Sequence, residues 1–232
     1  MLDPNFPNRL LKSGSIRTME FIYSLFEDYS KRDLSEKTDR AVAISGLEAR
    51  IADVLKCQSR YGIFQQFLHR NLLWQTSDNK MERIVYENQD VPSWSWMAYN
   101  GGIQFIKIPF GKVDWINNLQ FDKGHELALI TDVGEFRDCT MELDGKDYAI
   151  LDFSRTKRGW IQYDVKEDED LFKERCVVVG KMSNKDRDGL DIKEYYILVV
   201  RPTSVDGEYE RVGVGLIQSD YVVRQRVNVR VV

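Results

Sequence analysis

The sequence is poor in the residues that hold small secreted proteins together. Its 232 residues include only 3 cysteines and 2 histidines. Cys57, Cys139 and Cys176 are far apart in the sequence, and no C-x-x-C pair occurs. Neither a disulfide framework nor a zinc site is therefore indicated. We interpret the three cysteines as small core residues in a reducing compartment.

Long apolar runs and a basic excess are also missing. The longest apolar run, Tyr195–Val200, is too short to span a bilayer. Residues 1–7 lack the basic and apolar regions of a signal peptide. With 33 basic and 37 acidic residues the net charge is −4, whereas nucleic-acid-binding proteins normally carry a basic excess. The sequence predicts a cytoplasmic protein that binds neither a membrane nor nucleic acid.

Apolar residues, in contrast, are plentiful. The chain is 43% hydrophobic and contains 5 Trp, 11 Tyr and 11 Phe, which excludes a disordered chain. Its length fits one large domain or two small ones.

Apolar residues up to about residue 90 recur at helical spacing. One helix is expected from Ser15 to Tyr29, and a second opens at Thr38, whose side chain we expect to act as the N-cap. A third is expected from Ile63 to Leu73, with His69 on its polar face. Gly46 lies inside the second helix, and we attribute it to close helix packing. The apolar positions of the three helices are Met19, Ile22, Tyr23, Phe26 and Tyr29, then Ile44, Leu47, Ile51 and Leu55, then Phe64, Phe67, Leu68 and Leu72.

After residue 90 the hydrophobic pattern has the period of strands. Short runs alternate with turn signals, and Asp206-Gly207 marks the clearest hairpin. The runs are Ile103–Ile108, Val113–Phe121, Glu126–Val133, Tyr148–Phe153, Trp160–Val165, Arg175–Lys181, Tyr195–Arg201 and Tyr209–Gln218. We predict an α+β fold in which a helical region, residues 1–90, packs on a mostly antiparallel β-sandwich or barrel, residues 91–232. The two regions can also form one continuous domain.

No constellation of residues indicates catalysis, a cofactor or a metal. The sequence has neither a G-x-S-x-G elbow nor a phosphate-binding loop. Asn184–Gly189 resembles the start of a calcium loop but has Tyr195 where a bidentate Glu is needed. Gly213-Val-Gly215 lacks the third glycine of a dinucleotide fingerprint, and we expect it to allow close packing of a neighbouring element. We therefore predict no catalytic, cofactor-binding or metal-binding residues, and we expect both histidines to face solvent.

The most unusual local feature is Pro92-Ser93-Trp94-Ser95-Trp96. If this piece is extended, both indoles lie on one face. They could form a ligand or interface platform, or they could belong to the core. We favour core packing.

Four segments, in order along the chain, resemble a known family. Tyr29–Ser35 and Lys37–Leu47 are similar to the "YS-x-R-x-L-T" and "D-R-L-x-A-I-S-G" segments of fungal heterokaryon-incompatibility (HET) domain proteins. Tyr61–Phe64 with Asn71–Trp74 resembles their "Y-x-A-G-L-W…L-L-W" segment, and Pro92–Trp96 matches "P-S-W-S-W". Near the end, Tyr195–Val199 with Tyr209–Gly213 resembles the closing "Y-x-x-L…Y-x-R-x-G" hairpin. The residues that carry the resemblance, to which we assign a structural role, are Tyr29, Ser30, Asp39, Arg40, Ser45, Gly46, Tyr61, Trp74, Pro92, Trp94, Trp96, Tyr209, Arg211 and Gly213.

The resemblance is to the region that follows the HET domain. The motifs that define that domain, "A-L-S-Y-x-W-G" and "R-x-W-x-x-Q-E", do not occur in this sequence. The resemblance implies a non-catalytic accessory, regulatory or interaction region of a protein of fungal nonself recognition and programmed cell death. Its partner would be a HET-domain protein or a second copy of itself. The alternative is a small-molecule enzyme, a hydrolase that uses carboxylates of the β-rich half.

Overall fold

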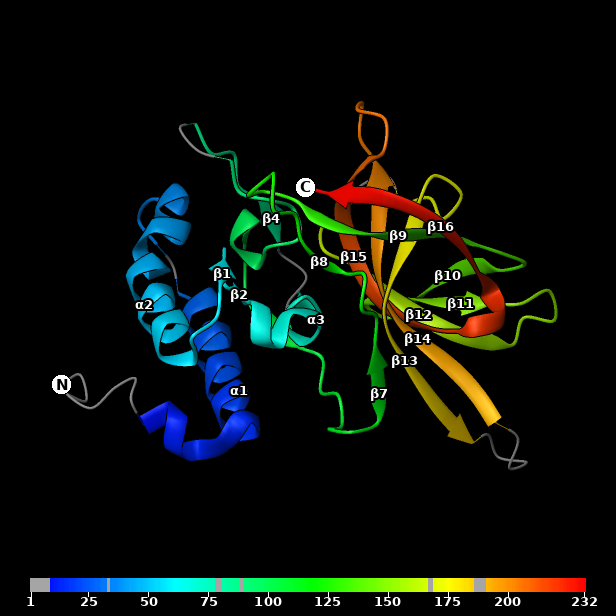
Figure 1. Cartoon of the computed structure of the whole chain (residues 1–232). Coiled ribbons are helices and arrows are strands. Elements are labelled where there is room, and N and C mark those ends of the chain that lie inside the picture. Colours follow the sequence, from blue (N-terminus) through cyan, green and yellow to red (C-terminus); the bar gives the residue numbers. More distant parts are fainter. Residues whose placement is uncertain (1–8, 33, 78–80, 88–89, 167–168, 186–190) are drawn as a thin grey trace.

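Helices lie at one end of the molecule, the large sheet lies at the other, and short elements connect them (Figure 1). This computed structural model describes residues 9–232 except 33, 78–80, 88–89, 167–168 and 186–190. None of its described helices is long and apolar enough to cross a membrane.

The first two helices form where the hydrophobic period predicts them. α1 (Arg9–Ser30) is kinked at Gly14, which has a φ of 77°, and α2 is Arg40–Leu55. Their apolar stripes are buried against each other and against the connecting elements. The expected N-cap is wrong, because Thr38 lies in a 3-10 turn, η1 (Lys37–Asp39), and α2 begins two residues later without a side-chain cap.

The third helix is much shorter than expected. Only α3 (Leu68–Asn71) is α-helical, and a hairpin of β1 (Ser59–Arg60) and β2 (Ile63–Phe64) with the 3-10 turn η2 (Gln65–Phe67) precedes it. The hairpin turn, Tyr61-Gly62, has φ angles of 48° and 78°, and the pairing that follows it places Ile63 and Phe64 in β2 instead of in a helix. The apolar residues of the expected helix are nonetheless buried as predicted.

Five strands close into a barrel. Neighbouring strands are antiparallel except where β15 and β16 meet in parallel, and this pairing joins Tyr209 to Val231 and closes the barrel. The barrel confirms the predicted α+β fold and its β-rich C-terminal region. Its strands in spatial order are β15 (Glu208–Gln218), β14 (Asp191–Pro202), β13 (Arg175–Lys185), β9 (Leu129–Phe136) and β16 (Val222–Val231).

The remaining strands extend the barrel or connect it to the helices. On the outer side of β15 the sheet continues through β12 (Lys157–Tyr163), β11 (Asp147–Leu151) and β10 (Thr140–Asp144). Two short strands add to the barrel wall, β7 (Val113–Trp115) beside β13 and β8 (Gln120–Phe121) beside β9. Two small ladders lie between the barrel and the helices: β3 (Trp74–Thr76) with β6 (Ile103–Phe105), and β4 (Glu82–Arg83) with β5 (Tyr99–Asn100). The other 3-10 turns are η3 (Trp96–Ala98) and η4 (Ser219–Tyr221).

The paired glycines of β15 pack tightly against β12, as predicted. A Cβ atom on Gly213 would lie 2.6 Å from the Gln162 carbonyl oxygen, and one on Gly215 would lie 2.4 Å from that of Trp160. Gly46 is different, because a Cβ there would have nothing within 4 Å. The explanation of Gly46 by close helix packing is therefore wrong.

Alanine substitutions at these glycines should change stability in opposite directions. Gly215→Ala inserts a methyl group into a closed contact, which should cost ~1–3 kcal/mol. Gly46→Ala should add about 1 kcal/mol, because alanine is the better helix former and the site is open. Urea denaturation of both variants measures the two shifts. A loss of stability in Gly46→Ala would contradict the open α2 surface.

Candidate functional site

Residues Val91–Tyr99, which we call the junction segment, are all buried although they form little regular structure. Backbone polar groups that are buried in this way need partners. Elements on both sides supply them. The Ser93 amide donates to the Val232 carbonyl (3.1 Å), and the Ala98 carbonyl accepts from the Ile84 amide (2.8 Å).

The two tryptophans of the junction segment do not lie on one face. Ser95 Oγ accepts a hydrogen bond from the Met97 amide (3.0 Å) and donates one to the Tyr61 carbonyl (2.7 Å), and this cap begins η3. Because the chain turns there instead of remaining extended, Trp94 joins the apolar cluster of the barrel and Trp96 joins that of the helices. The condition for a shared face, an extended chain, is therefore not met.

Both indoles are core residues. Trp94 and Trp96 are fully buried. The Trp94 indole donates to the Leu127 carbonyl (3.0 Å), whereas Trp96 packs 5.1 Å, centroid to centroid, from Phe26 of α1. This confirms core packing over a ligand platform, and it makes the junction segment the connection between two apolar clusters.

A fully buried arginine on β15, Arg211, lies beside the junction segment. Its Nε and Nη2 atoms each lie 2.9 Å from one oxygen of Asp164, which makes a bidentate ion pair. Nη1 donates to the Leu72 carbonyl and Nη2 also donates to that of Trp74, both at 2.6 Å. The guanidinium carbon lies 3.4 Å from the centroid of the Trp74 ring. Arg211 thus connects the barrel to the segment that ends α3.

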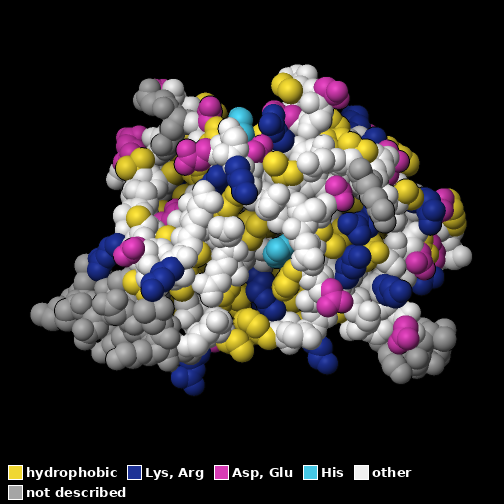
Figure 2. Space-filling view, in the orientation of Figure 1, with side chains coloured by type: hydrophobic (Ala, Val, Ile, Leu, Met, Phe, Trp, Pro, Cys, Tyr) yellow, Lys and Arg dark blue, Asp and Glu magenta, His cyan; other side chains and the backbone are white. Residues whose placement is uncertain are grey.

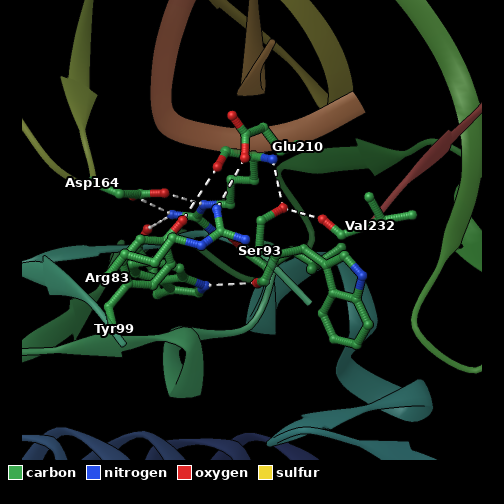
Figure 3. Close-up of polar contacts among 10 residues, drawn as sticks. Arg83, Ser93, Tyr99, Asp164, Glu210 and Val232 are labelled. Carbon is green, nitrogen blue, oxygen red and sulfur yellow. Dashed lines mark hydrogen bonds and ion pairs between the residues drawn. The ribbon is translucent and has the colours of Figure 1, made fainter. Parts of the chain in front are cut away.

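The backbone of Arg211 connects to the junction segment itself. Its amide donates to Ser93 Oγ (2.7 Å), and the Ser93 hydroxyl donates to the Val232 carbonyl. The Tyr99 hydroxyl donates to the Arg211 carbonyl (3.2 Å). Figure 3 shows Ser93 between Val232 and the strand that carries Glu210, with Asp164 on the opposite side. One end of the junction segment is therefore anchored to β15 and to the residue that follows β16.

Burial dominates the electrostatics of the ion pair. It raises the pKa of the Asp164 carboxyl, an effect that Arg211 opposes. A carboxylate in this position is costly without its cation, whereas the paired and fully hydrogen-bonded arrangement is tolerated. The Arg211–Asp164 pair is therefore a structural link whose two members depend on each other.

A second buried arginine, Arg40, holds the other end of the junction segment. Its guanidinium donates to the carbonyls of Ser30, Tyr99 and Gly101, the last at 3.2 Å. It lies 5.6 Å from the Trp96 ring centroid. No carboxylate among the described residues pairs with it, and burial lowers its pKa. Carbonyl groups and an aromatic face hold this cation where α1, α2 and β5 meet.

A small cavity of about 150 Å³ opens next to Arg211. Its walls carry two carboxylates, Asp164 and Glu210, and two partly exposed arginines, Arg83 and Arg201. Asp164 uses both of its oxygens on Arg211, and Glu210 pairs with Arg83 at 3.0 Å. A general base needs a carboxylate that can reach substrate, and here arginines already bind both carboxylates.

No histidine or cysteine is among the described residues that line this cavity. His125 is exposed, as expected, but His69 is half-buried and its Nε2 lies 2.7 Å from the Ile116 carbonyl oxygen. The solvent-facing position expected for His69 is therefore wrong, because its ring packs against Trp115, with centroids 5.5 Å apart. Cys139 and Cys176 are buried, and burial raises their pKa values to about 11 and about 12, which makes these thiols inert.

No group of three or more potential metal ligands occurs in the described part of the chain. Most of the calcium-like loop, residues 186–190, lies outside the described residues.

The residues that carry the family resemblance fall into three groups by burial. Eight are buried and three are half-buried, and most of these surround the two arginines or the junction segment. Asp39, Ser45 and Gly46 are exposed on or next to α2. The buried eight are Ser30, Arg40, Trp74, Pro92, Trp94, Trp96, Arg211 and Gly213, and the half-buried three are Tyr29, Tyr61 and Tyr209.

Asp164 is the site residue that sequence reasoning missed. It follows β12, whose last three residues are buried, and its partner Arg211 is 47 residues away. The available signal was a lone carboxylate at the end of a run expected to be buried, because a charge in such a place requires a counter-ion.

Comparisons of the chain with protein-family models, with curated proteins and with solved structures each found no match. The resemblance to HET-domain proteins rests on the motifs quoted above.

Proposed function

We propose that this chain is a non-catalytic interaction or regulatory region of a HET-type protein of fungal nonself recognition. The observation that carries the proposal is the position of the resembling residues. Eight of the fourteen are buried, and they hold a framework together around Arg40, Arg211 and the junction segment. Residues of a catalytic centre would instead converge on an accessible cavity with uncommitted acid or base groups.

The proposal includes a protein partner and a location. The partner is a HET-domain protein or a second copy of this chain, and the association takes place in the cytoplasm, without nucleic acid or membrane. In this proposal the framework presents a rigid outer surface, and partner binding shifts the activity of the HET domain that causes cell death.

Expression in a fungal host tests this function. The chain is co-expressed with a HET-domain protein, and co-purification and the viability of fused cells are scored with and without it. Gly46→Ala serves as a control that should fold normally. The proposal predicts association and a change in viability. Absence of both, across HET-domain proteins of the host, would contradict it.

A further inference from the structure

An apolar groove with a cavity of about 550 Å³ lies between α1 and the segment that follows β6. This volume is in the range of ~300–1,000 Å³ that is typical of ligand sites. Figure 2 shows hydrophobic side chains gathered at the lower centre of the molecule, between α1 and the segment leading to β7. Among the described residues, the groove shares no lining residue with the small cavity beside Arg211.

Side chains of α1 pair with backbone amides of β6 in a regular pattern that stops at this groove. The Ile103 amide donates to Ser30 Oγ (2.9 Å), and the Phe105 amide donates to Glu27 Oε1 (2.8 Å). Ser24 lies one helical turn before Glu27 on α1, and Lys107 lies two residues after Phe105. Both Ser24 and Lys107 line the groove.

The Lys107 amide is available to a ligand. Strand amides alternate in direction, and the Ile106 amide points the other way, to the Leu73 carbonyl (2.9 Å). The Lys107 amide should therefore point toward α1, as those of Ile103 and Phe105 do. No described residue accepts a hydrogen bond from it.

The walls of the groove are held in place before any ligand binds. Tyr23 and Phe105 stack with ring centroids 4.0 Å apart. On the other wall, Arg70 donates to the carbonyls of Ile108 (2.7 Å) and Pro109 (3.1 Å), and its guanidinium lies 4.1 Å from the Phe110 ring centroid. A preformed groove lowers the entropy that binding must overcome.

The α1 wall of the groove carries negative charge. Glu20 is exposed on α1, and no described residue forms an ion pair with it. Glu27 lies about two turns further along the same wall, and among the described lining residues Lys107 is the basic one. Phe110, with Arg70 over its ring, is 41% exposed and lines the groove opposite this acidic wall.

We propose that the groove binds an extended segment of a partner protein in which an apolar side chain is flanked by lysine or arginine. A backbone carbonyl of the segment accepts from the Lys107 amide, the apolar side chain packs against Tyr23 and Phe110, and a basic side chain pairs with Glu20. In this arrangement the main-chain hydrogen bond fixes the segment, and the apolar and charged contacts give specificity. The inference rests on the proposed function as an interaction region, and it names the chemistry of the partner.

Three synthetic peptides test the groove: Ac-RVLVR-NH2, its acidic counterpart Ac-EVLVE-NH2 and the polar-centred Ac-RVSVR-NH2. Each is titrated into the full chain while the amide signals are followed by NMR. The basic apolar peptide should shift the Lys107 amide and should bind at least about tenfold more tightly than the other two. Equal binding of the acidic and basic peptides, or no shift at Lys107, would overturn the proposal.

Two variants and a matched control sharpen this test. Glu20→Lys should reverse the preference so that the acidic peptide binds more tightly, and Phe110→Asp should weaken binding about tenfold or more. Phe153→Asp changes a more exposed phenylalanine, in the β11–β12 loop, and should leave binding unchanged. An unchanged preference in Glu20→Lys would overturn the proposal. Self-association that Phe110→Asp abolishes would also overturn it and would make a second copy the occupant.

Failure of this inference can be distinguished from failure of the proposed function. If a HET-domain protein still associates with Glu20→Lys and Phe110→Asp as with the unaltered chain, the groove is not its site although the proposed function stands. If the peptides bind as expected but no HET-domain protein associates, the groove stands and the proposed function fails.

Discussion

Arg211→Met should destabilise the protein by ~3–5 kcal/mol. The substitution leaves the buried Asp164 carboxylate without its bidentate partner, and it removes the donors that serve the Leu72 and Trp74 carbonyls. Methionine retains most of the apolar stem, so the loss reports the charge and its hydrogen bonds more than the volume. Urea denaturation at pH 7 measures it.

The double variant Arg211→Met with Asp164→Asn is the control. Removing the isolated charge should recover a large part of the stability, although the double variant carries one more substitution than Arg211→Met. If the double variant is less stable than the single one, an uncompensated Asp164 charge is not the cause.

The pH dependence of the same variants gives an independent reading. Burial raises the pKa of Asp164 in the folded chain above its unfolded value of about 3.9. In Arg211→Met, protonation of this carboxyl therefore favours the folded state below pH ~4, and this contribution is lost as the pH rises through the folded pKa. The difference in unfolding free energy between the single and double variants should shrink when the pH is lowered from 7 to 4. A gap that is constant with pH would contradict the assignment.

Trp94→Ala should cost ~3–5 kcal/mol, the loss expected for a large aromatic side chain deleted from a core. Its indole is fully buried in the barrel cluster and donates to the Leu127 carbonyl. Its carbonyl accepts from the Trp74 indole (3.0 Å), so the change also disturbs the segment that Arg211 holds. Thermal or urea unfolding measures the loss.

Trp160→Ala is the matched control for Trp94→Ala. Trp160 is half-buried on β12, away from the junction segment, so its removal should cost clearly less. If the two variants lose equal stability, the claim that Trp94 stabilises the core more than a half-buried tryptophan does is not supported.

The spacing of apolar residues along the sequence correctly predicted the long helix α1 but not the structure of the shorter segment Ile63–Leu73. The stripe from Met19 to Tyr29 has a helical period, and α1 forms there. Ile63–Leu73 has the same period, but the β1–β2 hairpin with its left-handed Tyr61-Gly62 turn takes Ile63 and Phe64 into a strand. Tertiary context overrides weak helix propensity in such short segments.

The candidate site depended on contacts that no local pattern contains. Trp94 and Trp96 are two residues apart, yet the Ser95 cap directs them into different clusters. Motif spacing indicated Arg40 and Arg211 but did not separate them from exposed Ser45 and Gly46, because burial is set by elements far away in the sequence. The pairing of Arg211 with Asp164 likewise joins residues that are far apart in the sequence.

The central claim is that the junction segment joins the helices and the barrel into one cooperative structure. The direct test is urea unfolding of the full chain followed by two probes at once: helical circular dichroism for α1 and α2, and NMR amide signals of β13 and β14 for the barrel. The account predicts coincident transitions in the unaltered chain. A helical transition at clearly lower urea than that of the barrel would contradict it.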